Sequence, residues 1–357
     1  MAHGVFYWHI DAECSTLIDD DFPARERRTG LMMSYRISGK ADVMRFKMTG
    51  IFASALSFLL TTTPVLAQTS SVTPTVAQFL NASNAQYILG GVPEGFKPFL
   101  VDGRQLKLRD VITGAVAATW ITPRNQLVIA YQGTTGGENL ITHPSALISQ
   151  ALTDAQVTLA LVDVAAPALV SSLTFAKRVV AAGKAQGYAA SNIFVTGHSL
   201  GGIEAEYVSS QIGLGGIGFE STGLGLIAAM GNTQNRGSNF VNVVTWGDTI
   251  GNISSDIPGN LLGYKAGSSG IFPHYGGIVM IGDQKDQDTL NALTLIPNFI
   301  KYHLPGVQAH DLGIQLNPYS AIVDNAGDMT GTVYSVGNAT IPELVADAKR
   351  TGRYYPR

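Results

Sequence analysis

The chain has 357 residues, a formal net charge of −3, 14% charged residues and a single cysteine, Cys14. The sequence has no basic stripe, so the composition gives no sign of a nucleic-acid-binding surface. One cysteine cannot form an internal disulfide or a cysteine-based metal or redox motif, so a folded domain has to rely on its apolar core.

A segment in the first fifth of the chain has the pattern of a secretory signal peptide. Arg45 and Lys47 precede an apolar stretch from Ile51 to Leu60, and the small-residue cleavage pattern Val65-Leu66-Ala67 stands before Gln68. The apolar stretch is shorter than a transmembrane helix, which needs ~20 residues. The segment therefore predicts export and no transmembrane span.

This pattern divides the chain in two. A signal peptide works from the N-terminus, so translation that begins at Met44 or Met48 would explain its position. We expect residues 1–67 to be a leader, with the signal peptide at 44–67, and residues 68–357 to form a single domain. The expected location is outside the cell or in the periplasm.

Strand-like and helix-like segments alternate along residues 68–357. The expected strands lie within 106–134, the second of two at Gln126–Thr134, and at 192–196, 221–232 and 239–248. The expected helices lie at 169–187, 203–212, in a helix–turn–helix at 287–316, and at 340–350, with a glycine-rich loop at 262–277. This alternation predicts an α/β fold with a mainly parallel sheet and helices on its faces.

One glycine-rich turn carries a catalytic motif. The sequence from Val195 to Val208 is VTGHSLGGIEAEYV, in which Gly197, Ser199 and Gly201 fit the nucleophile elbow G-x-S-x-G. The motif requires a strand before the serine and a helix after it, and both are predicted here. Ser199 is therefore the candidate nucleophile.

A serine nucleophile needs a base, and its histidine is expected after the acid in chain order. The histidines of residues 68–357 are His143, His198, His274, His303 and His310. The first precedes Ser199, the second lies inside the elbow, and the third lies in the glycine-rich loop. Of the two that remain, we expect His310 to be the base, because it is predicted to stand directly before a helix. His303, at a helix end before Pro305, is the alternative.

The acid is expected at the carboxyl end of a strand. Asp248 follows the strand-like run Asn239–Trp246, and we assign it this role. Asp256, eight residues later, is the alternative, although an aspartate at that place also suits a turn.

The oxyanion hole needs two backbone N–H groups. One is expected from Leu200, the residue after the nucleophile. The other is expected from Thr134, in the loop YQGTTGG (Tyr131–Gly137) that follows an apolar strand upstream of the elbow.

At these residues the sequence resembles the secreted lipases of the α/β-hydrolase fold. It is most similar to bacterial lipases of the RTX-secreted kind and more distantly to fungal class 3 lipases. The resemblance covers about residues 120–315 and rests on VIAYQGT, NIFVTGHSLGG and FVNVVTWGDTIGN. It implies an α/β-hydrolase fold and places the acid at Asp248. The family's histidine can be matched to His303 through HLP or to His310 through spacing.

The sequence departs from that family at two features. Gln132 stands where the family usually has arginine, and the calcium-binding β-roll repeats are absent from the sequence, so the family's calcium requirement is not carried over. The residues themselves predict no metal ligand and no cofactor. The family also has helical lids. Residues 141–164 lie where one would be, and their apolar content suits either a lid or a buried core helix.

The predicted function is hydrolysis of hydrophobic acyl esters by a secreted serine hydrolase, a lipase or carboxylesterase, with the substrate at a lipid or polymer interface. An extracellular polyester depolymerase is an alternative within this class. A non-catalytic binding module that retains the elbow is an alternative of another class.

Overall fold

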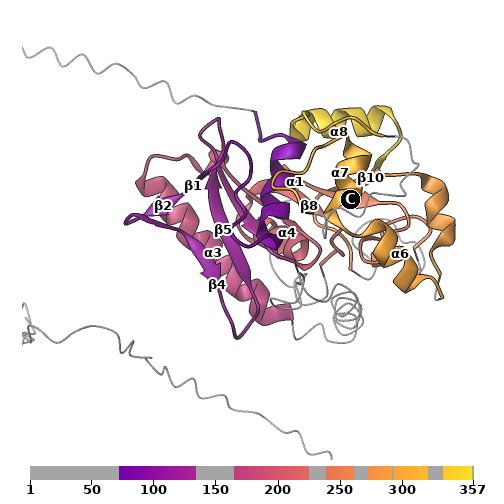
Figure 1. The fold of residues 1–357 in the computed structure, drawn as a ribbon, viewed down its shortest axis with the longest axis horizontal. Coiled ribbons are helices and arrows are strands. Elements are labelled where there is room, and N and C mark those ends of the chain that lie inside the picture. Colours follow the sequence, from indigo (N-terminus) through magenta and orange to yellow (C-terminus); the bar gives the residue numbers. More distant parts are fainter. Residues whose placement is uncertain are drawn as a thin grey trace, which may run out of the picture. The chain divides into compact units, whose positions relative to one another are not determined.

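The computed structural model describes residues 72–133, 165–224, 239–260, 272–320 except 292, and 333–355. All of these belong to one compact unit, residues 66–357 (Figure 1). The expected signal peptide and the expected lid or core helix at 141–164 lie outside the described residues.

The centre of the unit is a mixed sheet, to which the described residues contribute nine strands. The strands are β1 (Lys97–Pro98), β4 (Lys107–Arg109), β5 (Val116–Ile121), β6 (Leu127–Tyr131), β7 (Ile193–His198), β8 (Gly215–Phe219), β9 (Phe240–Thr245), β10 (Gly277–Ile281) and β11 (Tyr354–Tyr355). Their order is β1-β5-β6-β7-β8-β9-β10-β11, with β4 also paired to β5. Strands β6 to β10 are parallel to one another, and the pairs at both ends are antiparallel. Strands β2 (Leu100–Val101) and β3 (Arg104–Gln105) form a separate hairpin.

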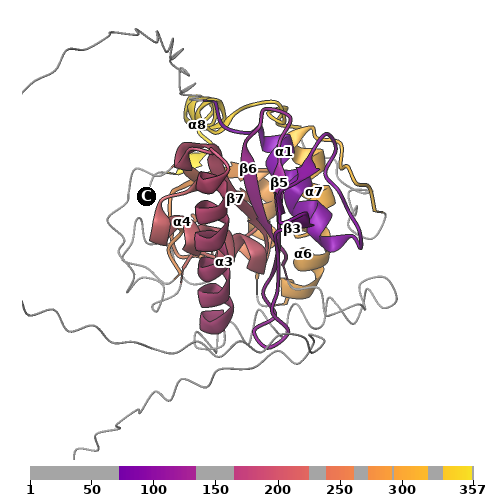
Figure 2. The ribbon, with the colours of Figure 1, turned by 90° about the vertical axis from the view of Figure 1, so that its left-hand side faces the viewer.

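Helices cover both faces of the sheet. The helices are α1 (Val76–Asn84), α3 (Ala165–Ala185), α4 (Leu200–Ile212), α6 (Leu295–Tyr302), α7 (Pro305–Leu312) and α8 (Ile341–Arg350). Short 3₁₀ helices lie at η1 (Ala85–Tyr87), η3 (Ala190–Asn192), η4 (Gly251–Ile253) and η6 (Gln284–Thr289). Figure 2 shows α3 and α4 on one side of the strands and α1 and α7 on the other.

The alternation of side chains along β6 separates two apolar cores. Val128 and Ala130 pack with α1, α7 and α8, whereas Leu127, Ile129 and Tyr131 pack with α3 and α4. Side chains on a strand point alternately to its two faces, so a strand buried on both faces is apolar throughout. The predicted sheet of mainly parallel strands flanked by helices is confirmed.

The strand expected at 221–232 is wrong in its described part. Residues 221–224 are not a strand, 225–238 lie outside the described residues, and the strand at this place is β8, GGIGF. A Cβ on Gly216 would lie 1.9 Å from the carbonyl oxygen of Val195 on β7. The close approach of β7 thus requires glycine in a strand, although glycine has a low strand propensity.

Two elements differ from the sequence reading in another way. Helix α1 lies before residue 106, where the sequence pattern predicts no helix or strand, and Thr75 and Gln78 form a capping box at its start. Strand β10 begins at Gly277, the last residue of the expected glycine-rich loop.

Candidate active site

Ser199 stands at a sharp turn between β7 and α4. Its backbone has φ 58° and ψ −128°, a conformation that is uncommon for a residue with a side chain. The Ser199 N–H donates to the Phe219 carbonyl at the end of β8 (2.8 Å), and this bond anchors the turn to the sheet. A Cβ on Gly197 would lie 2.0 Å from the Gly201 carbonyl oxygen, and one on Gly201 2.5 Å from the Tyr131 carbonyl oxygen. The two glycines of the motif are therefore required by packing.

The side chains of Ser199, His303 and Asp248 form one hydrogen-bonded chain. His303 Nε2 lies 2.8 Å from Ser199 Oγ, and His303 Nδ1 lies 3.0 Å from Asp248 Oδ1. His303 and Asp248 are buried. The carboxylate accepts from Nδ1–H, which leaves Nε2 as the acceptor for the serine hydroxyl proton.

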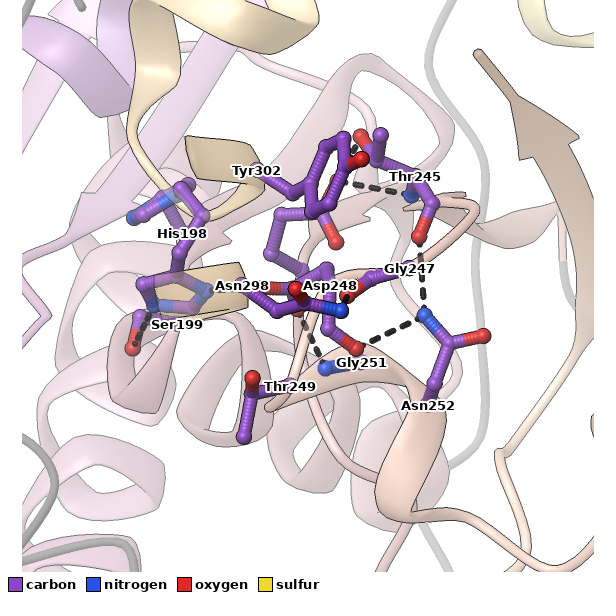
Figure 3. Close-up of polar contacts among 12 residues, drawn as sticks. His198, Ser199, Thr245, Gly247, Asp248, Thr249, Gly251, Asn252, Asn298 and Tyr302 are labelled. Atoms are coloured by element: carbon purple, nitrogen blue, oxygen red, sulfur yellow. Dashed lines mark hydrogen bonds and ion pairs between the residues drawn. The ribbon is translucent and has the colours of Figure 1, made fainter. Parts of the chain in front are cut away.

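The loop after β9 fixes the carboxylate of Asp248. The Gly251 N–H donates to Asp248 Oδ2 (2.5 Å), and the side-chain amide of Asn252 donates to the backbone carbonyls of Thr245 and Asp248 (both 2.8 Å). Figure 3 shows these bonds around the turn. Asp248 stands just past the end of its strand, as the sequence reading expected, and it lies next to a histidine.

Two hydrogen bonds join this loop to α6, the helix that ends just before His303. The side-chain amide of Asn298 donates to the Gly247 carbonyl (3.1 Å; Figure 3), and Thr249 Oγ1 donates to the Leu295 carbonyl (2.7 Å). The acid and the histidine therefore come from segments that are fixed to each other.

The imidazole of His303 is held on both sides by rings. Phe299 stacks on it with 4.4 Å between ring centroids, and the ring of His198 lies 4.9 Å away. His198 Nε2 lies 2.6 Å from the His303 carbonyl oxygen, and the Tyr87 hydroxyl lies 2.7 Å from His198 Nδ1. A carbonyl only accepts, so Nε2 of His198 carries the proton and Nδ1 accepts from Tyr87. Burial, followed by the nearby His303, lowers the pKa of His198 well below its ordinary value, so His198 is a neutral support.

The expectation that His310 lies beside Ser199 is wrong. Helix α7 begins at Pro305 and ends with Gly313 in the left-handed C-cap, so His310 lies in its last turn and not before it. Its Nδ1 faces Asp311 Oδ1 at 3.2 Å. Proline is favoured at the first position of a helix, and that preference sets the start of α7 two residues after His303. The place directly before the helix is therefore next to His303.

The alternative acid, Asp256, forms a separate buried pair. His274 donates to it twice, from its backbone N–H (2.7 Å) and from Nδ1 (2.9 Å), and His274 Nε2 lies 3.0 Å from the Ser221 carbonyl. Burial alone would lower the pKa of His274, but the nearby Asp256 carboxylate outweighs it and the pKa is raised. Burial alone would raise the pKa of Asp256, but the nearby His274 outweighs it and the pKa is lowered. Asp256 is thus the partner of His274 and not of His303.

The described part of the candidate oxyanion hole lies next to Ser199. Leu200 is the first residue of α4, and the first N–H groups of a helix have no partner inside it. Thr134 lies outside the described residues, which end at Gly133 in this loop. A Cβ on Gly133 would lie 3.2 Å from the Cβ of Ser199, so the chain approaches the nucleophile just before Thr134.

The described residues lack two features, a membrane-spanning helix and a cluster of metal-binding side chains. None of their helices is long and apolar enough to cross a membrane. They also contain no group of three or more His, Cys, Asp or Glu side chains that could hold a metal ion.

Comparison with solved structures finds lipases at low similarity. The Rhizomucor miehei lipase–propeptide complex is 16% identical with a TM-score of 0.36, over 59% of this chain and 68% of that one. A Penicillium expansum triacylglycerol lipase is 15% identical with a TM-score of 0.33, over 58% and 81%. A triacylglycerol lipase with a serine protease triad as its catalytic centre is 14% identical with a TM-score of 0.35, over 64% and 92%. No protein-family profile matches the chain, and no curated protein matches its sequence.

These TM-scores are too low to carry an argument about activity. The fold class rests on the strand order and on the helices that cover both faces of the sheet, an arrangement consistent with an α/β-hydrolase-like fold. The chemistry of the site rests on its own geometry.

Proposed function

We propose that the protein is a serine ester hydrolase in which Ser199 is the nucleophile, His303 the base and Asp248 the acid that orients it. The observation that carries the proposal is the hydrogen-bonded chain from Ser199 Oγ to His303 Nε2 (2.8 Å) and from His303 Nδ1 to Asp248 Oδ1 (3.0 Å). A serine, an imidazole and a buried carboxylate in this order are the groups of acyl transfer.

The reaction proceeds in two halves. Ser199 Oγ attacks the acyl carbonyl while His303 Nε2 takes its proton, and Asp248 stabilises the imidazolium that forms. The N–H of Leu200 and that of Thr134 are the proposed donors to the oxyanion. His303 then gives the proton to the leaving alkoxide. Water then attacks the acyl-enzyme with His303 again as the base. His303 returns a proton to Ser199 Oγ, and the carboxylic acid product is released.

The proposed substrates are esters of apolar acids, as in a lipase or carboxylesterase. Support comes from exposed apolar side chains at the start of α6, the helix that leads to His303: Leu293, just before the helix, is 92% exposed and Ile296, in its first turn, is 55% exposed. Exposed apolar side chains suit contact with an apolar acyl chain. The signal-peptide pattern supports the further proposal that the enzyme acts outside the cell.

A fluorophosphonate probe tests this function directly. The probe should modify the wild-type protein on the peptide that contains Ser199, and the protein should hydrolyse p-nitrophenyl esters. Ser199→Ala should neither react nor hydrolyse, while its circular dichroism spectrum stays that of the wild type. A wild-type protein that neither reacts nor hydrolyses would support the non-catalytic binding module instead.

A further inference from the structure

A second buried carboxyl group lies beside the candidate acid. Glu220 directly follows β8, and Asp248 lies just past the end of the neighbouring strand β9. The Glu220 side chain is fully buried, and its backbone N–H donates to the Val243 carbonyl (3.0 Å). Its φ of 48° lies in the left-handed region, which residues with side chains seldom adopt. Strained backbone of this kind is concentrated at active sites and binding sites, where the surrounding structure holds a side chain in one orientation.

The two oxygens of Glu220 have different surroundings. Oε1 accepts hydrogen bonds from the backbone N–H of Thr245 (2.9 Å) and from its hydroxyl (2.6 Å). Oε2 is buried and receives no hydrogen bond from any described group. A Cβ on Gly251 would lie 3.0 Å from Glu220 Oε2 and 3.2 Å from Asp248 Oδ2, so both oxygens face the same point. The carboxyl groups of Glu220 and Asp248 therefore lie close together.

Two carboxyl groups in contact can form a hydrogen bond only if one of them is protonated. Burial, followed by the nearby Asp248, raises the pKa of Glu220 well above its ordinary value. The carboxylate of Asp248 instead accepts from the Gly251 N–H and faces His303 Nδ1. Among the described residues, Asp248 is the titratable side chain that faces Glu220. His303 lies on the other side of Asp248, at its Oδ1 atom. The shared proton therefore belongs to Glu220.

We propose that Glu220 is a positioning residue of the site: its protonated Oε2 donates a hydrogen bond to Asp248 and holds that carboxylate toward His303. In this arrangement Asp248 is fixed from the Gly251 side, the Glu220 side and the His303 side. Among the described residues, this arrangement leaves the carboxylate of Asp248 as the one negative charge next to the imidazole. The inference rests on the proposed function, because the orientation of Asp248 affects the rate only if His303 is the base.

Two substitutions separate the hydrogen bond from the charge. Glu220→Gln keeps an acceptor for Thr245 and a neutral donor for Asp248. Glu220→Leu keeps much of the volume and removes the donor. Glu204→Gln is the matched control, since Glu204 is another buried glutamate whose pKa burial raises well above the ordinary value, and it lies within helix α4.

The test measures kcat, KM and the pH profile of kcat/KM on a p-nitrophenyl ester. Glu220→Gln should stay within about threefold of wild type in kcat, with the acidic limb of the profile unmoved, as should Glu204→Gln. Glu220→Leu should lower kcat by about tenfold or more with KM little changed, because a hydrogen bond to a charged group is lost. An ionised Glu220 would instead stabilise the imidazolium of His303, so Glu220→Gln would move the acidic limb to lower pH. That shift, or unchanged kcat in Glu220→Leu, would overturn the proposal.

An infrared difference spectrum between wild type and Glu220→Gln at neutral pH gives a readout without turnover. A protonated-carboxyl band that is present in the wild type and absent in the variant supports the proposal, and carboxylate bands in its place overturn it. This result holds even if Glu220→Leu fails to fold. Absence of ester hydrolysis and of probe labelling in the wild type would instead refute the proposed function, so the two failures are distinguishable.

Discussion

The buried pair of Asp256 and His274 should be a main support of the fold next to the site. Asp256→Ala removes the acceptor of two donors, the backbone N–H and Nδ1–H of His274, and His274 has no exposed surface. Leaving a buried donor unpaired costs about 1–3 kcal/mol, and breaking a buried ion pair by removing one partner costs about 3–5 kcal/mol. We therefore expect Asp256→Ala to lower the free energy of unfolding by about 3–5 kcal/mol near pH 6.

The effect should depend on pH in a defined direction. The raised pKa of His274 gives stability that is present below the ordinary histidine pKa of about 6.5 and is lost as pH rises through the raised value. The lowered pKa of Asp256 gives stability that is present above the ordinary aspartate pKa of about 3.9 and is lost as pH falls through the lowered value. The contribution of the pair should therefore be greatest between about pH 4 and 6.5.

Urea denaturation followed by tryptophan fluorescence at several pH values measures this directly. Asp256→Asn is the control, since its amide can accept from the backbone N–H of His274 and donate to Nδ1 of a neutral imidazole. Asp256→Asn should lower the free energy of unfolding by less than Asp256→Ala does, and it should retain ester hydrolysis. The reasoning is refuted if the free energy of unfolding of Asp256→Ala lies within about 1 kcal/mol of the wild-type value, since an ordinary substitution has an effect of that size.

Two further substitutions test the acid and the elbow. Asp248→Asn should fold normally and lose about 10⁴-fold in turnover, because an amide neither stabilises the imidazolium nor holds its tautomer; a nearly neutral effect in the kinetic assay would remove Asp248 from the site. Gly201→Ala should destabilise the protein by about 1–3 kcal/mol, because the added Cβ would meet the Tyr131 carbonyl oxygen at 2.5 Å. A thermal unfolding curve like that of wild type would show that the elbow has more room than this geometry allows.

Ser199 and Asp248 could be predicted from the sequence because their signals are local. A nucleophile elbow needs its glycines within two residues of the serine, and Asp248 follows an apolar strand by a short turn. The mainly parallel character of the sheet also follows from the alternation of strands and helices, since parallel neighbours need crossover connections.

The histidine could not be chosen in this way because His303 and His310 lie within one helical hairpin. What separates them is the first residue of α7, Pro305, and the preference of proline for that position is a signal in the sequence itself. Read in this way, the tripeptide HLP leaves His303 in the turn and moves His310 into the helix.

Other features depend on contacts between distant segments. The glycines of β8 are required by the neighbouring strand β7, so strand propensity missed this strand and with it Glu220 at its end. Asp256 and His274 stand 18 positions apart in the sequence, and nothing in the local sequence of either residue indicates the other. Patterns along the chain report local geometry well and such pairings poorly.

The most direct test of the account compares two histidine substitutions under one assay. His303→Ala should lose about 10⁶-fold in kcat on a p-nitrophenyl ester, the scale of losing the base of a serine hydrolase. His310→Ala removes a partly exposed imidazole that faces Asp311, and it should keep at least about a tenth of wild-type kcat, because His310 lies outside the proposed triad. Loss of activity in His310→Ala with activity retained in His303→Ala would contradict the account.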